Sequence, residues 1–279
     1  MIRLTTPLLE LLAPLSLGGD QFSVPASAEG RVRLYGGQVV AQALAAATAT
    51  VAGDRPAHSL HAYFIRAGRV DTPTFFRVMR DRDGRSVSAR RVEASQDGEP
   101  ILTLSVSFHE GEAGPEHSEV GFPDVPDPES LPSYVDLLPP DMSSRMTLGP
   151  MTEMDIRPID GCGPDMTLGG PPRGLMWFRI PAGISEDAAV QRVLLSYASD
   201  MGLLAAAMRP HPELSLRSRV ASLDHAVWFH DEARVDDWLL YAHDSPWAAR
   251  ARGLVRGSIL SRDGRLIASV AQEGLLRVG

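Results

Sequence analysis

The sequence is organised around the stretch from Ala189 to Met208, which reads AVQRVLLSYASDMGLLAAAM. Its apolar residues recur at intervals of three and four positions, which is the spacing of one face of an α-helix. The residues on this face are Val190, Val193, Leu194, Tyr197, Ala198, Met201, Leu204, Ala205 and Met208. Ser185 precedes the stretch as an expected N-cap, and Pro210 follows as a stop signal. The sequence therefore predicts one long helix with one face in the core.

One carboxylate, Asp200, interrupts this helix. At 3.6 residues per turn it lies about 80° from the centre of the apolar stripe. A carboxylate at the margin of a buried face must find hydrogen-bond partners or shift its pKa. From the helix alone two interpretations stay open: a surface aspartate on the flank, or a functional carboxylate.

The rest of the chain repeats one plan twice. An Ala-rich segment after Gly36-Gly37 predicts a helix enclosed by other structure, and strands are expected over 58–68, 72–81, 85–95 and 100–110. In the second half strands are expected over 151–159 and 175–181 before the Asp200 helix, and over 218–230, 236–244, 251–260 and 265–278 after it. The hairpin turn Asp97-Gly98 recurs 166 residues later as Asp263-Gly264. We interpret this as a duplication of one unit, a helix followed by an antiparallel sheet.

A proline-rich, acidic tract separates the two halves. Its weak periodicity is typical of a connection between domains. We therefore expect an α+β protein with an N-terminal unit over 1–112, a connector over 113–150, and a C-terminal unit over 151–279 that carries the catalytic residues.

Composition limits the classes of partner. The 27 basic and 35 acidic residues give a net charge of −8, which disfavours a general nucleic-acid binder but leaves room for a small anion on a local group of arginines. A single cysteine, Cys162, suits a reducing compartment. Residues 1–19 contain Glu10 and Pro14 and so favour a short amphipathic helix over a signal peptide. With no apolar run long enough for a membrane span, a cytoplasmic location is expected.

Several common catalytic sites are absent from the sequence. There is no GxSxG or GxxxxGK[ST] motif, and lysine is absent, which removes Schiff-base chemistry. His58 and His61 face opposite sides of their expected strand, which disfavours a shared zinc ion. Neither a metal nor an organic cofactor is expected.

Three polar residues remain in apolar settings. They are Asp200, Ser222 within VASLDHAVWF, and Gln272, which has the parity of its apolar neighbours on a strand and so is expected to point to the enclosed side. A carboxylate, a hydroxyl and an amide that converge can hold and polarise a water molecule. Each of the three can equally be a structural residue, because spacing does not prove convergence.

Seven segments together resemble the type II acyl-CoA thioesterases (thioesterase B-like). They are YGGQVVAQAL, HSLHAYFIRAG, DGRSVSARRVEASQDGEPI, LLSYASD, ASLDHAVWFH, ARGLVRG and ASVAQEG, and the likeness runs from about Leu8 to Val278. The resemblance implies a double hotdog fold, in which each long helix is wrapped by a curved antiparallel sheet. It also implies hydrolysis of acyl-CoA to free fatty acid and coenzyme A by an activated water.

Matched residue by residue, the resemblance places the catalytic triad on Asp200, Ser222 and Gln272. The sequence departs from the family pattern at two positions, with Ser222 where threonine is common and Tyr35 where phenylalanine is usual. The oxyanion donors are expected among backbone N–H groups such as those of Gly36-Gly37. The arginines available for the coenzyme A phosphates are Arg66, Arg90, Arg91, Arg252 and Arg256.

Two alternatives stay open. A hotdog enoyl-CoA hydratase would need a paired Asp and His, and His225 is the histidine nearest to Ser222, although its strand parity is opposite. A non-catalytic acyl-CoA binding protein would lack a member of the triad. By analogy with the fold, we also expect a homo-oligomer.

Overall fold

The computed structural model describes residues 6–27, 33–52, 55–138, 153–164, 168–181, 187–214 and 219–278. The first half comprises α1 (Thr6–Leu12), β1 (Leu15–Gly18), β2 (Gln21–Val24), α2 (Gly36–Thr48), β3 (Ala57–Phe64), β4 (Thr74–Asp83), β5 (Val87–Gln96) and β6 (Glu99–His109). The second half comprises β7 (Asp155–Asp160), β8 (Arg173–Arg179), α3 (Ala188–Ser199), α4 (Ala205–Met208), β9 (Arg219–Ser222), β10 (Asp224–Phe229), β11 (Leu239–Ala249), β12 (Arg252–Ser261) and β13 (Leu266–Arg277).

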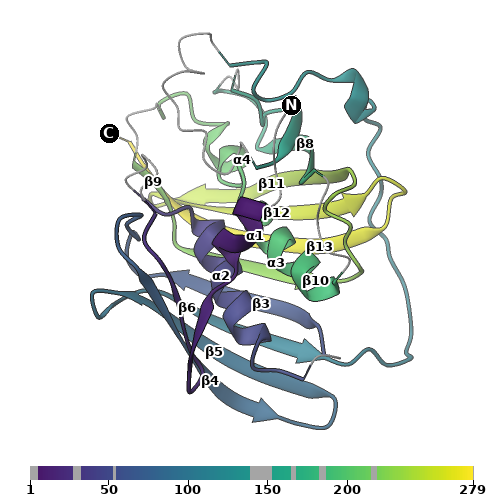
Figure 1. The fold of residues 1–279 in the computed structure, drawn as a ribbon. Helices are drawn as coiled ribbons and strands as arrows, with labels where there is room; N and C mark the ends of the chain where they lie inside the picture. Colours follow the sequence, from purple (N-terminus) through teal and green to yellow (C-terminus); the bar gives the residue numbers. More distant parts are fainter. Residues whose placement is uncertain are drawn as a thin grey trace.

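The strands form one antiparallel sheet in the order β1-β2-β4-β5-β6-β3-β10-β13-β12-β11-β8-β7, and β9 also pairs with β13. The pair β3–β10 joins the two halves at its centre. Outward from this centre the strands run β3-β6-β5-β4 on one side and β10-β13-β12-β11 on the other, so that the duplication is visible in the topology. Figure 1 shows α2 and α3 next to each other, with the strands of both halves around them. This is the predicted α+β arrangement.

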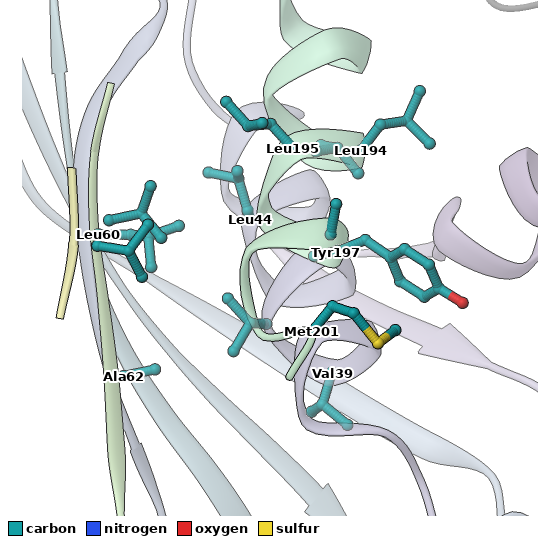
Figure 2. Packing of buried hydrophobic residues seen from close by; sticks show 14 of the residues in the cluster. Val39, Leu44, Leu60, Ala62, Leu194, Leu195, Tyr197 and Met201 are labelled. Atoms are coloured by element: carbon teal, nitrogen blue, oxygen red, sulfur yellow. The ribbon is translucent and has the colours of Figure 1, made fainter. Parts of the chain in front are cut away.

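The two long helices hold the halves together through their apolar faces. Leu44 of α2 and Leu194 and Leu195 of α3 are completely buried, as is Leu60 of β3 (Figure 2). Each such side chain contributes roughly 1.5–3 kcal/mol relative to an exposed one. This packing fixes the start of α2 beside the end of α3, where the polar residues of interest lie.

The helix predicted over Ala189–Met208 is two helices. α3 ends at Ser199, Asp200 is its C-cap, and α4 begins only at Ala205. Gly202 lies between them with φ of +65°, the left-handed conformation that commonly ends helices. The expected N-cap Ser185 lies outside the described residues, and Asp187 caps the helix by accepting a 2.8 Å hydrogen bond from the backbone N–H of Ala189.

The strand predicted over 218–230 is also interrupted. Ser222 of β9 pairs with Gly274, whereas Ala226 of β10 pairs with Ala271, so the strand contains one more residue than its partner over this interval. This is a one-residue β-bulge, and it reverses the parity of the residues that follow it. The side chain of Asp224 accepts a 2.6 Å hydrogen bond from the backbone N–H of Glu273 at the bulge.

The described part of the connector contains one short helical turn, η1 (Pro128–Ser130). It contacts the second half, since the indole N–H of Trp177 donates to the carbonyl of Pro126 and Arg262 pairs with Glu129. Among the described residues, no helix is long and apolar enough to cross a membrane.

Candidate active site

A pocket of about 350 Å³ opens where the start of α2 meets the end of β3 and β9. Most of its wall is apolar, and Asp200, Ser222 and Arg66 are its polar side chains. The apolar side chains come from both halves of the chain and are those of Leu34, Val39, Phe64, Ile65, Ala67, Ile101, Leu102, Ala221, Leu223 and Leu275. An apolar cleft with a few convergent polar groups is the usual form of a small-molecule site.

Asp200 lies between two helix ends. Its Oδ2 accepts a 2.9 Å hydrogen bond from the backbone N–H of Gly37, in the first turn of α2. The N-terminal end of a helix favours a negative charge, whereas the C-terminal end of α3, which Asp200 caps, disfavours one. The Tyr35 hydroxyl donates a 2.9 Å hydrogen bond to the carbonyl of Tyr197 and so ties the two helix ends together.

The glycine pair allows this close approach. A Cβ on Gly36 would lie 2.8 Å from Oδ2 of Asp200, and a Cβ on Gly37 would lie 2.5 Å from the backbone oxygen of Tyr197. Both separations are too short for a real side chain, so each position requires glycine if the helices are to pack as they do.

The environment of Asp200 tunes its acidity. Burial raises the pKa of its carboxyl above the ordinary value of 3.8. The nearby His225, the Gly37 N–H and the Gln272 amide act in the opposite direction, but they do not cancel the effect of burial. A carboxylate with a raised pKa is a stronger base, which suits proton abstraction near neutral pH.

Ser222 and Gln272 are in direct contact. The Gln272 amide Nε2 donates a 2.5 Å hydrogen bond to Oγ of Ser222. As its parity on the strand predicts, Gln272 points inward, and it is 1% exposed. The structure thus brings the three predicted residues together in two layers: Asp200 and Ser222 line the pocket, and Gln272 lies buried behind them.

His225 also belongs to this group, although its position in the sequence predicted that it would lie on the opposite face of the strand from Ser222. Its ring is completely buried, with Nδ1 2.6 Å from Oε1 of Gln272 and Nε2 2.8 Å from Oγ of Ser199. The bulge between Ser222 and Ala226 reverses the parity and turns His225 to the same face as Ser222. In the sequence, His225 could be noticed only as a histidine in an otherwise apolar segment. No residue pattern predicted the bulge that turns it inward.

The five arginines considered for coenzyme A occupy different places. Arg66 lines the pocket. Arg90 is 1% exposed and bonded to Thr50 and Asp83, so it is a structural residue of the first half. The others pair with acidic residues away from the pocket lining: Arg91 with Asp81, Arg252 with Glu273 and Arg256 with Asp244.

The single cysteine has no part in this site. Cys162 is partly buried, and the burial of its thiol raises the pKa to about 12, so the thiol stays protonated. Within the described ranges, no cluster of three or more His, Cys, Asp or Glu side chains has the geometry to hold a metal ion.

Comparison with known proteins agrees with the geometry. Residues 166–275 match the acyl-CoA thioesterase family, and residues 24–109 match the N-terminal domain of acyl-CoA thioesterases. Human acyl-coenzyme A thioesterase 8 is 36% identical over 272 residues, which cover 93% of this chain and 84% of the relative. The chain belongs to the acyl-CoA thioesterase family.

Solved structures of this fold include a member of the acyl-CoA thioesterase family. The acyl-CoA thioesterase II TesB2 from Mycobacterium marinum is 34% identical, with a TM-score of 0.81 and 98% of each chain covered. A hot dog fold protein from Alicyclobacillus acidocaldarius has a TM-score of 0.81 at 21% identity, with 99% of this chain and 100% of that chain covered. The second likeness concerns the fold alone. Together with the sheet topology, these structures confirm the predicted double hotdog fold.

Proposed function

We propose that this thioesterase hydrolyses acyl-CoA thioesters by direct attack of water activated by Asp200. The observation that carries the proposal is the position of the Asp200 carboxylate in an apolar pocket, beside a hydroxyl that is itself held by a buried amide. The carboxylate supplies a base, and the apolar wall suits an acyl chain.

In the proposed mechanism, Asp200 removes a proton from water while the water oxygen attacks the thioester carbonyl carbon. Ser222 holds the water, and Gln272 acts on it through Ser222. Since the N–H of Gly37 is bonded to Asp200, the N–H of Gly36, also at the start of α2, is the proposed donor to the developing oxyanion. The tetrahedral intermediate then breaks its C–S bond, and protonated Asp200 returns the proton to the departing sulfur. The products are a carboxylic acid and the free thiol of coenzyme A.

Arg66 is the proposed contact for the phosphates of coenzyme A. It lines the pocket, and its side chain is about half exposed, at 49%, beside Glu99. An exposed ion pair is worth little, so a phosphate can compete for this guanidinium. Arg66→Gln should raise KM for an acyl-CoA and leave KM unchanged for the same acyl group on pantetheine. An equal rise for both thioesters would remove Arg66 from phosphate binding.

The organisation around this site is proposed as well. The boundaries 1–112, 113–150 and 151–279 are supported by the two family matches, which lie in the first and third segments. A homo-oligomer and a cytoplasmic location complete the proposal, and both rest on analogy and composition.

The decisive experiment measures free thiol released from acyl-CoAs of several chain lengths, with wild-type protein and with Asp200→Asn. Thiol release by the wild type alone supports the proposal. A hydratase would instead consume an enoyl-CoA without releasing thiol. That outcome is disfavoured because His225, its required second residue, is buried and does not line the pocket.

A further inference from the structure

We infer that His225 is a positioning residue that fixes the orientation of the Gln272 amide, and through it the orientation of the Ser222 hydroxyl. The inference rests on the proposed function of this site. It begins with four side chains in one hydrogen-bonded row: Ser199, His225, Gln272 and Ser222. Asp200 directly follows Ser199 in the chain, so the row starts and ends beside the proposed base.

An amide side chain has a nitrogen that donates hydrogen bonds and an oxygen that accepts them, and only one orientation of Gln272 suits the site. Its amide nitrogen must face Ser222 and the Asp200 carboxylate, since a carboxylate only accepts hydrogen bonds. Its oxygen then needs a donor on the buried side, where water does not reach because Gln272 is 1% exposed. Nδ1 of His225, 2.6 Å from this oxygen, is that donor. The Ser199 hydroxyl has one proton and two acceptors within reach, Nε2 of His225 at 2.8 Å and the carbonyl of Ser196 at 3.0 Å. Nδ1 is a donor if this proton points to Nε2, or if the ring carries a proton on both nitrogens.

The orientation of Gln272 in turn sets the Ser222 hydroxyl. Because Oγ of Ser222 accepts from Gln272, its own proton points away from Gln272 and toward the pocket. A flipped Gln272 would present its oxygen to Ser222 and to Asp200. The hydroxyl proton would then be drawn inward, and the carboxylate would face a second negative dipole.

The pKa of Asp200 depends on which orientation of the Gln272 amide is present. The other titratable groups facing it are Tyr35, just before α2, and Tyr241 on β11, and Arg66 lines the same pocket. Burial raises the pKa values of both tyrosines well above their ordinary value, so they stay neutral in the working range. A flip of the Gln272 amide therefore raises the pKa of Asp200 without a competing titration from the tyrosines.

Two polar substitutions of similar size separate orientation from packing. In His225→Asn, an amide nitrogen takes the place of Nδ1 and keeps the donor to Gln272. In His225→Gln, the amide lies near the place of Nε2, and the donor to Gln272 is lost. We expect His225→Gln to lower kcat about 10- to 100-fold with little change in KM, the scale of a weakened general base. The acid limb of its kcat/KM profile should move to higher pH. Both variants lose the direct effect of His225 on the pKa of Asp200, so His225→Asn should recover most of kcat and have an acid limb between those of His225→Gln and the wild type.

His243 provides the matched control, because it is a second buried histidine, at 4% exposure, outside this row. His243→Asn and His243→Gln should affect thermal stability alone and show no contrast in kcat. Equal losses of kcat in the two His225 variants, with the same acid limb in both, would overturn the inference and leave His225 without a role in orienting the amide. If Asp200→Asn remains inactive in that case, the proposed function still stands.

A measurement on the wild-type protein does not depend on the folding of any variant. With ¹⁵N-labelled histidine, NMR reads the tautomer of the His225 ring. We expect the proton on Nδ1. A neutral ring with its proton on Nε2 alone would make Nδ1 an acceptor, require the opposite amide orientation, and refute the inference.

Discussion

The backbone N–H of Gly37 donates a 2.9 Å hydrogen bond to Oδ2 of Asp200, across 163 positions of sequence and between the two halves of the chain. The first half thus supplies the start of a helix that partly offsets the cost of a partly buried carboxylate in the second half. The same contact leaves the carboxylate on the pocket wall. The two similar halves therefore differ in what they contribute: the second half carries the proposed base, Asp200, and the first half donates the hydrogen bond that holds it.

The first prediction concerns the balance between activity and stability at Asp200. Because burial raises its folded-state pKa, ionised Asp200 destabilises the folded protein above that pKa. Asp200→Asn should lower kcat by about 10²–10⁴-fold. It should also raise Tm by a few degrees near pH 7.5. Each unit by which the folded-state pKa is raised lowers the free energy of unfolding of the wild type by about 1.4 kcal/mol at that pH.

The gain in Tm should disappear toward pH 3, where Asp200 is protonated in the folded and unfolded wild type alike. Scanning calorimetry of both proteins at the two pH values checks this. A monodisperse Asp200→Asn protein with native turnover would exclude Asp200 as the base, and an equal Tm difference at both pH values would exclude the ionisation as its cause.

The second prediction is the pH dependence of hydrolysis. The base acts only when ionised, so kcat/KM should fall as pH drops through the pKa of Asp200. Since burial raises that pKa, the midpoint should lie above 3.8, the ordinary value for an aspartate. Initial rates in buffers of constant ionic strength give the midpoint. An acid limb at or below 3.8 would mean that the carboxylate is better solvated or better paired than the structure shows.

The third prediction tests the hydroxyl and the amide. Ser222→Thr keeps the hydroxyl that accepts from Gln272 and should stay active, whereas Ser222→Ala should lose turnover more than thermal stability. Gln272→Ala should do likewise, since it removes the support of the hydroxyl. Measuring kcat together with Tm for the three variants separates the two effects. Full activity of Ser222→Ala would leave the hydroxyl without a role in positioning water.

The fourth prediction uses the close approach of the helix ends. In Gly36→Ala, the new Cβ would meet Oδ2 of Asp200 at 2.8 Å and the ring of Phe64 at 3.0 Å. We expect a loss of kcat/KM of at least about tenfold, on the scale of misplacing a catalytic group. In Gly37→Ala the Cβ would meet the backbone oxygen of Tyr197, so the helices must move apart and Tm should fall.

Gly114→Ala is the control for this pair, because its Cβ meets nothing within 4 Å. It should match the wild type in both Tm and kcat/KM. If Gly36→Ala also matches the wild type, Asp200 has room to retreat, and its position against α2 is not required for activity.

Much of the scaffold was predictable because it rests on local periodicity. The hairpin turn Asp97-Gly98 and the inward parity of Gln272 follow from residues within a few positions of each other. What escaped prediction depends on single backbone irregularities. The left-handed Gly202 ends α3 and makes Asp200 a C-cap, and the bulge after Ser222 turns His225 inward. The hydrogen bond from Gly37 to Asp200 could not be predicted either, because it forms only when two helices that are distant in the sequence pack together.

The last prediction concerns the number of sites in each chain. A duplicated fold suggests one active site per half, yet α2 contains no acidic residue, and Val106 on β6 occupies the place that Gln272 has on β13. Val106 is 3% exposed and part of the core, so it offers no polar group to a second site. The first half contributes Gly37 and Phe64 to the site around Asp200 instead. Asp200→Ala should therefore abolish essentially all hydrolysis. If about half of the wild-type rate remained with an unchanged KM, the first half would have to catalyse by itself, and the division of tasks between the halves would be wrong.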